Sequence, residues 1–362
     1  MAEKQAFPWA PGTATGVGSM PGENPLEAAR VVASELPDLP HLTELPGRGP
    51  GADITGRAAA LLVDLPVELA GPRGWRVAER PGRDVRRARS LLSSDLDAME
   101  ESLEGYAGPL KIQLAGPWTL AAAIEQPHSL SPALADPGLV ADLTSSLAEG
   151  AATHVAEVAK RLPGATVLVQ FDEPALTAAL RGTVPTPSGL SRVRAVDEEI
   201  VRDRLRAVLA ATPKYTVVHS CAQDVPFGII MEAGADAVSF DPGQLRRGDF
   251  DGFAEAAEAG LGMLVGALPT TGPTTGPAGA QGPDAGGRGG RDERRRPTPS
   301  DTAGVVRDLW RKMDLPAAQC APQVVLTPAC GLAGVSPAQA RDALRWCREA
   351  ARLLPEMMDE LS

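Results

Sequence analysis

Short hydrophobic strands alternate with amphipathic helices along most of the chain, and this alternation recurs about eight times. The clearest strands are runs of five or six residues, at 110–114, 167–171, 214–219, 235–240, 261–266 and 323–327. Strands separated by helices run parallel in one sheet, and the number of repeats favours a closed (β/α)8 barrel over an open sheet. We therefore predict an α/β protein with a TIM-barrel fold, in which residues 1–362 form a single domain.

One late segment does not follow the alternation. Residues 269–300 consist largely of glycine, proline, threonine and arginine, and they show no hydrophobic periodicity. Such a segment cannot bury enough apolar surface to offset the entropy lost on ordering, so we predict a disordered insertion. Its arginine cluster, 294–296, has acidic neighbours at 292 and 293, which favours a solvated linker over a binding site for a polyanion.

The charge and the cysteine content exclude several classes of partner. A formal net charge of −11 at pH 7 disfavours binding to nucleic acids and to anionic membranes. No apolar run reaches membrane-spanning length, and the first residues lack the hydrophobic stretch of a signal peptide. Four cysteines in 362 residues do not suggest a disulfide framework. We therefore expect a cytoplasmic protein with reduced thiols, which binds neither nucleic acid nor membrane.

Two strands end in residues that can bind a metal. One predicted strand ends in His219 and, two residues later, Cys221. Positions i and i+2 of a strand point to the same side, so the imidazole and the thiol can bind one ion. Cys330 follows the last predicted strand in the same way, and two thiols with an imidazole suit zinc, which prefers tetrahedral nitrogen and sulfur ligands. Taken alone, the H-x-C pattern also fits a buried histidine beside an inert cysteine.

Other unusual residues also stand just past the ends of predicted strands: Ser19, Asp172 and Asp241. In a barrel these ends form one rim, where active sites are built. Residues more than a hundred positions apart are therefore expected to meet around one point. Each residue also has a plain structural interpretation, because Asp172 fits a helix N-cap and Asp241 fits an ordinary turn.

Five short motifs occur in order over nearly the whole chain: 17–21 (VGSMP), 114–119 (LAGPWT), 170–176 (QFDEPAL), 219–221 (HSC) and 327–332 (TPACGL). Together they resemble the catalytic domain of the cobalamin-independent methionine synthase family, within the uroporphyrinogen decarboxylase-like barrel superfamily. The D-E-P-A and P-x-C-G-L pieces are the most specific. The resemblance is to the short, single-barrel form of the family.

The resemblance implies a zinc ion held by His219, Cys221 and Cys330 and a homocysteine site beside it. Asp241 stands where the family has a glutamate as the fourth ligand. The backbone and hydroxyl donors of the segment Val17, Gly18 and Ser19 are implied to hold the homocysteine carboxylate, and Asp172 and Glu44 to hold its ammonium group. Zinc keeps a bound thiol deprotonated at neutral pH, which makes the thiol a nucleophile.

Two departures from the family concern the methyl donor. Ala123 stands where the family has a tryptophan against folate, and the histidine expected after Gly266 is replaced by 267–271 (ALPTT). A donor that needs neither aromatic stacking nor protonation would suit these changes. Because short archaeal-type relatives are thought to use methyl-corrinoid, we predict a corrinoid protein or methylcobalamin as the donor.

The leading prediction is therefore a zinc-dependent methyltransferase that makes methionine from homocysteine. Transfer of another alkyl group to a thiol is one alternative. A second is a uroporphyrinogen decarboxylase-like reaction, which needs cationic residues for several propionates and no metal. The third is a zinc-holding barrel that has lost its donor site, since the site rather than the fold decides function.

Overall fold

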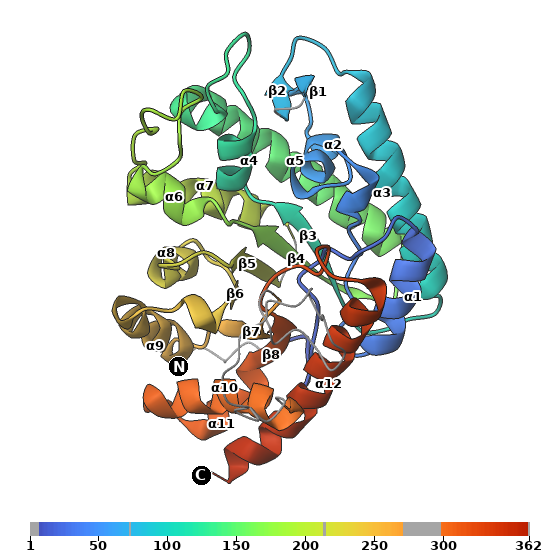
Figure 1. Cartoon of the computed structure of the whole chain (residues 1–362), viewed down its shortest axis with the longest axis vertical. Helices are drawn as coiled ribbons and strands as arrows, with labels where there is room; N and C mark the ends of the chain where they lie inside the picture. The colour runs from blue at the N-terminus through green and yellow to red at the C-terminus, as the bar shows by residue number, and fades with distance from the viewer. Residues whose placement is uncertain (1–6, 72–73, 213–214, 271–297, 361–362) are drawn as a thin grey trace, which may run out of the picture.

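Six parallel strands form the centre of the computed structural model, which describes residues 7–71, 74–212, 215–270 and 298–360 (Figure 1). The strands pair in chain order, and every pair is parallel. They are β3 (Pro109–Ala115), β4 (Thr166–Asp172), β5 (Thr216–Ser220), β6 (Ala237–Phe240), β7 (Gly262–Leu268) and β8 (Val324–Pro328). Their nearly continuous apolar sequences suit strands that are buried on both faces.

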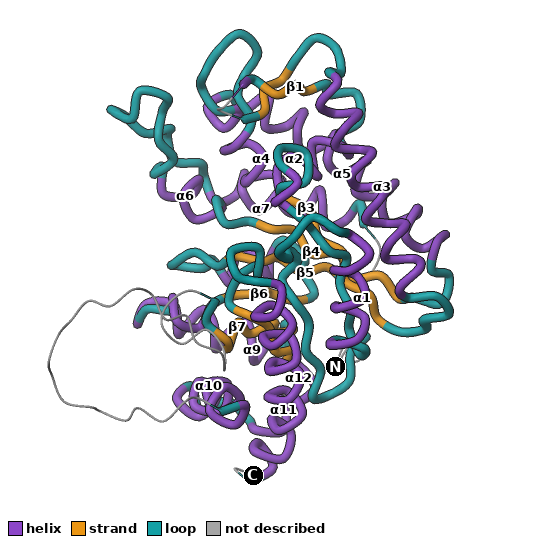
Figure 2. The backbone as a smooth tube through the Cα atoms, turned by 45° about the vertical axis from the view of Figure 1, so that its right-hand side comes forward, coloured by secondary structure: helices purple, strands orange, loops and turns teal. Residues whose placement is uncertain are grey.

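Helices connect the strands and lie around the outside of the sheet (Figure 1, Figure 2). The α-helices are α1 (Pro25–Glu35), α2 (Ile54–Leu61), α3 (Arg83–Ser102), α4 (Pro117–Ala123), α5 (Pro137–Arg161), α6 (Leu176–Arg181), α7 (Glu198–Ala210), α8 (Phe227–Glu232), α9 (Phe250–Glu258), α10 (Pro299–Lys312), α11 (Ala317–Gln323) and α12 (Pro337–Asp359). Short 3-10 helices are η1 (Pro46–Arg48), η3 (Ala133–Ala135), η4 (Pro242–Gln244) and η5 (Arg247–Asp249). None of the helices in the described part of the chain is long and apolar enough to cross a membrane.

The two outer strands of the sheet, β3 and β8, are joined by two extended segments, 13–20 and 40–44. Leu326 of β8 exchanges two backbone hydrogen bonds with the first segment, at 3.0 and 3.1 Å, and Lys111 of β3 exchanges two with the second, both at 2.9 Å. The segments bond to each other through the backbone of Glu44, at 2.8 and 3.2 Å. The prediction is thus confirmed in part, as a barrel-like α/β fold with six regular strands, and the two extended segments form isolated bridges.

The sequence predicts helix caps at Asn24 and Asp136 and a capping box that begins at Ser336, and these helices begin there. The Asn24 side chain accepts hydrogen bonds from two amides at the start of α1, and Asp136 does the same for α5. Ser336 and Gln339 form the predicted capping box of α12. These caps satisfy backbone amides that have no partner within the helix, so a local sequence signal is enough to place the helix start.

The sequence over 56–70 predicts a helix, and this prediction is wrong in its second half. The helix α2 ends at Leu61, and β1 (Val67–Leu69) pairs antiparallel with β2 (Trp75–Val77) as a hairpin. Asp64 has a positive φ of 53°, which breaks the helix before the hairpin. The backbone of Glu125 bonds to Val77 at 3.0 Å and to Trp75 at 2.8 Å, so a distant segment holds the hairpin in place.

Two predictions about chain organisation are not tested by this structure. The predicted disordered insertion, 269–300, lies for the most part outside the described residues. The assignment of the whole chain to a single domain also stays a prediction.

The inward side chains of the sheet form layers whose character changes along the strands. The layer near the amino-terminal ends is apolar and forms one buried cluster: Trp9, Leu39, Leu168, Val217, Ala237, Leu264 and Val325. Since side chains alternate between the faces of a strand, the next inward position lies two residues further on. There the buried residues are polar: Gln170, His219, Ser239 and Thr327. Barrel interiors are ordinarily filled by branched apolar residues, so this polar layer indicates a functional site at the carboxyl-terminal ends of the strands.

Candidate functional site

Three of the residues predicted from the sequence occupy the next inward positions, at the carboxyl ends of β4, β5 and β6. They are Asp172, Cys221 and Asp241, each two residues beyond a member of the polar layer. The fold therefore places a carboxylate, a thiol and a second carboxylate on neighbouring strands at one end of the sheet. Cys330 follows β8, which reaches the same end.

The thiols of Cys221 and Cys330 meet at this end, with their Sγ atoms 4.0 Å apart. Two cysteine sulfurs bound tetrahedrally to one zinc, each at about 2.3 Å from the metal, lie about 3.8 Å apart, so the pair fits one ion with little movement. Contact with the Cys221 thiol lowers the pKa of Cys330 to about 6, whereas the contact with Cys330 and burial raise the pKa of Cys221. Of the two thiols, Cys330 is therefore the one that loses its proton more readily.

The imidazole of His219 is buried and electrically neutral. Burial, together with the nearby Lys111 ammonium, lowers the pKa of His219 to about 3. Its Nδ1 lies 2.8 Å from the Ser239 hydroxyl on β6. A neutral imidazole that is held through one ring nitrogen is the form that binds metals through the other, so Nε2 is the nitrogen suited to a metal.

The predicted metal ligands do not all converge. Asp241 caps η4, where its Oδ1 accepts a hydrogen bond from the Gly243 amide at 2.8 Å and its Oδ2 accepts one from Gln244 Nε2 at 3.4 Å. The Asp241 charge nevertheless acts on the pKa of Cys330, which it raises. Within the described ranges no three His, Cys, Asp or Glu side chains form a group ready to hold a metal ion. The donor chemistry fits zinc through the thiol pair and the neutral imidazole, and the complete ligand set stays a prediction.

Ser19 is brought beside Cys330 by close packing of glycines. A Cβ added at Gly331 would collide with the Ser19 hydroxyl oxygen, so the hydroxyl occupies the space next to the Cys330 backbone. Gly18 is constrained in the same way, because a Cβ there would lie 2.8 Å from Gln113 Cγ. These glycines let the predicted carboxylate-binding segment approach the thiol pair closely.

Asp172 and Glu44 are two buried carboxylates, each with 5% of its surface exposed. Burial, and then the Glu44 charge, raise the pKa of Asp172 well above its ordinary value. Burial raises the pKa of Glu44 as well, against the opposing charge of Arg57. The Gln170 amide donates to Asp172 Oδ1 at 2.7 Å and holds it in place. Carboxylates whose charged form is disfavoured by burial favour the arrival of a cation, such as the ammonium group of an amino acid.

Glu173, the neighbour of Asp172, has a structural role. Its carboxylate accepts hydrogen bonds from the Trp118 amide at 3.0 Å and from the amide and hydroxyl of Thr119, both at 2.8 Å. It thereby caps the amino terminus of α4, and Gly116 must be glycine because a Cβ there would collide with the carboxylate. The helix-cap interpretation thus applies to Glu173, whereas Asp172 is free to serve the site.

Replacing Glu173 by alanine is expected to lower the free energy of unfolding by about 2–4 kcal/mol, because three buried donors lose their acceptor. Chemical denaturation measures this change. Glu349→Ala, at an exposed position on α12, is the matched control and should change stability by less than about 0.5 kcal/mol. An equal effect of both substitutions would contradict the capping role.

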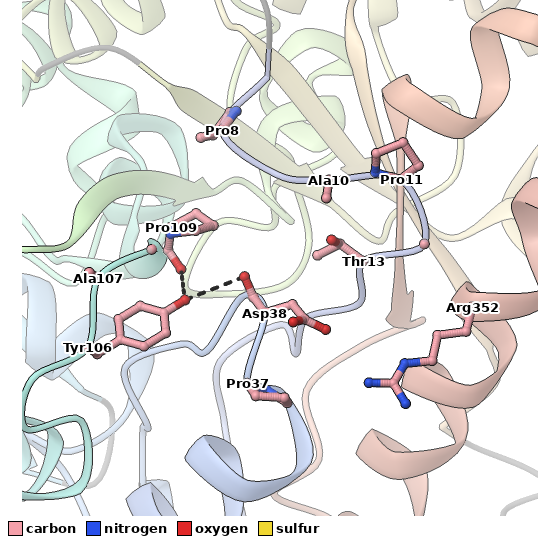
Figure 3. A pocket seen from close by; sticks show the side chains of 12 residues that line it. Pro8, Ala10, Pro11, Thr13, Pro37, Asp38, Tyr106, Ala107, Pro109 and Arg352 are labelled. Atoms are coloured by element: carbon pink, nitrogen blue, oxygen red, sulfur yellow. Dashed lines mark hydrogen bonds between the residues drawn. The ribbon is translucent and has the colours of Figure 1, made fainter.

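The pocket shown in Figure 3 lies at the opposite end of the sheet and contains none of the predicted site residues. Its volume is about 420 Å³, and Asp38, Tyr106 and Arg352 are among its lining residues. The Tyr106 hydroxyl donates to the Pro109 carbonyl at 2.9 Å, beside the start of β3. Because Asp38 and Arg352 are exposed to solvent, this pocket provides no buried polar group that would define a ligand.

The comparisons with known proteins agree with this location of the site. The sequence profile of a family described as "Cobalamin-independent synthase, Catalytic domain" matches residues 133–278. Over this segment the chain is similar to the cobalamin-independent methionine synthase family. Members of this family are methyltransferases of methionine biosynthesis, so the chain is assigned to that class of enzyme.

A solved structure shares the fold of this cobalamin-independent synthase homologue. It is a B12-independent methionine synthase from Shewanella sp. W3-18-1 in complex with selenomethionine. The alignment covers 97% of this chain and 100% of that chain, with a TM-score of 0.62 and 14% sequence identity. At this identity the likeness establishes the fold. No curated protein gives a significant sequence match.

The family assignment corrects one prediction. Both descriptions name synthases that are independent of cobalamin, which conflicts with the predicted corrinoid protein or methylcobalamin as methyl donor. That donor is withdrawn. The replacements at Ala123 and after Gly266, on which it rested, therefore do not identify a donor.

The matched segment contains four of the predicted site residues: Asp172, His219, Cys221 and Asp241. The remaining five lie outside it: Val17, Gly18, Ser19, Glu44 and Cys330. The fold brings them to the same end of the sheet, through the bridge between Ser19 and Glu44 and through the contact between the two thiols.

Sequence reasoning missed the buried residues that form hydrogen bonds to the predicted site residues and position them. Ser239 holds His219, Gln170 holds Asp172, and Lys111 bonds to the carbonyl of Val17 at 2.8 Å. A signal for two of them was present, because Gln170 and Ser239 each stand two residues before a predicted site residue on the same strand. A polar residue at that spacing on an otherwise apolar strand faces the interior below the site.

Proposed function

We propose that the protein transfers a methyl group to the thiol of homocysteine, and that His219, Cys221 and Cys330 hold the zinc ion that activates this thiol. The observation that carries the proposal is the pair of thiols 4.0 Å apart at the carboxyl-terminal end of a barrel-like sheet, next to a buried neutral imidazole. Asp241 is proposed as a labile fourth ligand, since it is held by its own turn close to Cys330. Methyl transfer to homocysteine is the reaction that the family assignment supports.

The chain's own residues are proposed to fix both ends of the substrate. Asp172 and Glu44 accept the ammonium group, whose charge offsets the cost of burying the two carboxylates. The backbone of Val17 and Gly18 and the hydroxyl of Ser19 hold the carboxylate beside Cys330. Holding both ends directs the thiol toward the ligand set and converts methyl transfer into an effectively unimolecular displacement.

A bound zinc ion would supply deprotonation of the substrate thiol, whose pKa in water is about 8.5, while leaving the sulfur nucleophilic. His219 contributes a neutral ligand, so the ligand set carries two thiolate charges that match a divalent cation. Buried surroundings at Asp172 and Glu44 exclude water from the ammonium end of the substrate. Cys330 is exposed to solvent, and the methyl donor is proposed to approach the site from that side.

We also interpret the six strands and the two extended segments as the eight positions of a (β/α)8 barrel. The continuous backbone bonding from β8 through 13–20 and 40–44 to β3 supports this interpretation.

Metal analysis combined with X-ray absorption tests the proposed function. The purified protein is expected to contain one zinc per chain, and addition of homocysteine should add one sulfur to the coordination shell. Growth of a methionine auxotroph that expresses the protein tests the complete reaction. Protein that carries stoichiometric zinc but shows no new sulfur with homocysteine would contradict thiol activation.

Replacing Ser239 by alanine is expected to weaken zinc binding by about 10–100-fold, because the partner that orients a metal-binding histidine is lost. Competition with a fluorescent zinc chelator measures the change in affinity. Ser145→Ala is a suitable control, since this exposed serine bonds only to the carbonyl of Ala141 within α5. Unchanged zinc affinity in Ser239→Ala would show that the contact with His219 Nδ1 has no role in metal binding.

A further inference from the structure

Lys111 is a fully buried cation in the interior of the barrel. None of its surface is exposed, and it lies on β3 opposite Leu168 of β4, at the height of the apolar layer. Its Nζ donates hydrogen bonds to the Val17 carbonyl at 2.8 Å and to Gln113 Oε1 at 3.3 Å. Burying an ammonium group without a function is unfavourable, since an apolar side chain of similar length would fill the same space.

The hydrogen bonds of Lys111 lead to the residues that are proposed to bind the substrate. The Val17 carbonyl accepts a second hydrogen bond from Gln170 Nε2 at 3.0 Å, and the same nitrogen donates to Asp172 Oδ1 at 2.7 Å. One carbonyl therefore links the ammonium of Lys111 to the carboxylate-binding segment and, through Gln170, to Asp172. Both ends of the substrate site rest on this network.

Gln113 forms the second branch of the network. It accepts a hydrogen bond from Lys111 and donates through Nε2 to the Leu42 carbonyl at 2.6 Å. It also acts by hydrogen bonding on the Glu44 carboxylate, which follows Leu42 in the same extended segment. Lys111 is thus connected to both acids of the predicted ammonium site, one through Gln170 and one through Gln113.

Buried groups of both charges lie around Glu44 and Lys111. Asp95 is neutralised by Arg48, at 2.7 and 2.8 Å, and by the Arg57 guanidinium, which also lies 3.6 Å from Glu44. Two arginines and one aspartate leave one positive charge for Glu44. Lys111 is the remaining cation, and Asp172 and Glu44 are the carboxylates whose charges act on it, Asp172 more strongly. Charged groups of both signs therefore lie beside the site that is proposed for the two charged ends of the substrate.

We infer that Lys111 is a positioning residue that makes this site select a zwitterionic α-amino acid carrying a thiol over a simple thiol carboxylate. It supports Asp172 and Glu44 as a pair of acceptors for the ammonium group, and it supports Val17 in the segment that holds the carboxylate. This inference rests on the proposed function and specifies the substrate class of the same site.

Lys111→Met tests the inference, because methionine keeps the length of the side chain and removes the charge. Isothermal calorimetry on the zinc-loaded protein compares L-homocysteine with 4-mercaptobutanoate, which lacks only the amino group. The dissociation constant of 4-mercaptobutanoate divided by that of L-homocysteine is expected to fall at least about tenfold in the variant, while the zinc content stays unchanged. Lys160→Met, at an exposed position on α5, is the control and should leave the ratio unchanged.

The outcomes separate this inference from the proposed function. A ratio that stays at the wild-type value in Lys111→Met, or equal weakening of both ligands, overturns the positioning role. Wild-type protein that binds neither ligand overturns the proposed function. If Lys111→Met does not fold, Gln170→Leu keeps the cation and removes only the link to Asp172, and it should lower the same ratio.

Discussion

Replacing either Cys221 or Cys330 by serine is expected to remove stoichiometric zinc and to lower methyl transfer to homocysteine by more than about 100-fold. Loss of a partner that only orients a metal ligand costs about 10–100-fold, so loss of a ligand itself should cost more. The two sulfurs lie 4.0 Å apart, whereas the other two cysteines, Cys320 and Cys347, are buried on the helices α11 and α12. Zinc content by atomic absorption and methionine formation measure the two effects.

Cys320→Ala provides the control for the thiol substitutions. Cys320 is buried on α11, before β8 begins, and lies outside the thiol pair. This variant should keep one zinc per chain and full methyl transfer, with any change limited to stability. Retention of stoichiometric zinc by Cys221→Ser or by Cys330→Ser would show that the ligand set is different.

The parts of the fold that the sequence predicted are those with local causes. Asn24, Asp136 and Ser336 each sit directly before the helix that they cap, so adjacent residues are enough to place them. The hairpin at 67–77 could not be predicted in this way. It depends on backbone bonds to Glu125, and no pattern within the hairpin reveals a partner so far along the chain.

The site was predictable to a similar degree. The proposed metal ligands His219, Cys221 and Cys330 are unusual residue types at strand ends, and the alternation of strands and helices predicts that they lie on one rim. Lys111 was not predictable, because a lysine in a strand ordinarily faces solvent and only the three-dimensional fold shows that this side chain is buried.

The adjacent acids Asp172 and Glu173 show why sequence alone leaves roles open. Both are buried carboxylates, and either fits a cap or a ligand. Three-dimensional packing decides between them, because the contact with Gly116 and the donors of α4 occupy Glu173. Asp172 is left facing Gln170 and the inner site. This division of roles leads to a test in which each acid serves as the control for the other.

Replacing Asp172 by asparagine is expected to weaken homocysteine binding by about 100-fold, equivalent to about 3 kcal/mol, because the buried ammonium loses its charged partner. The zinc content should stay at one per chain, since Asp172 is not among the proposed ligands. Glu173→Gln keeps the shape of the neighbouring acid and should change homocysteine affinity by less than about threefold, while lowering stability by about 1–2 kcal/mol. Calorimetric titration with homocysteine and chemical denaturation of both variants measure the two effects. Because the two substitutions remove the same kind of charge at adjacent positions, a comparable loss of affinity in both would mean that Asp172 does not act as the ammonium partner.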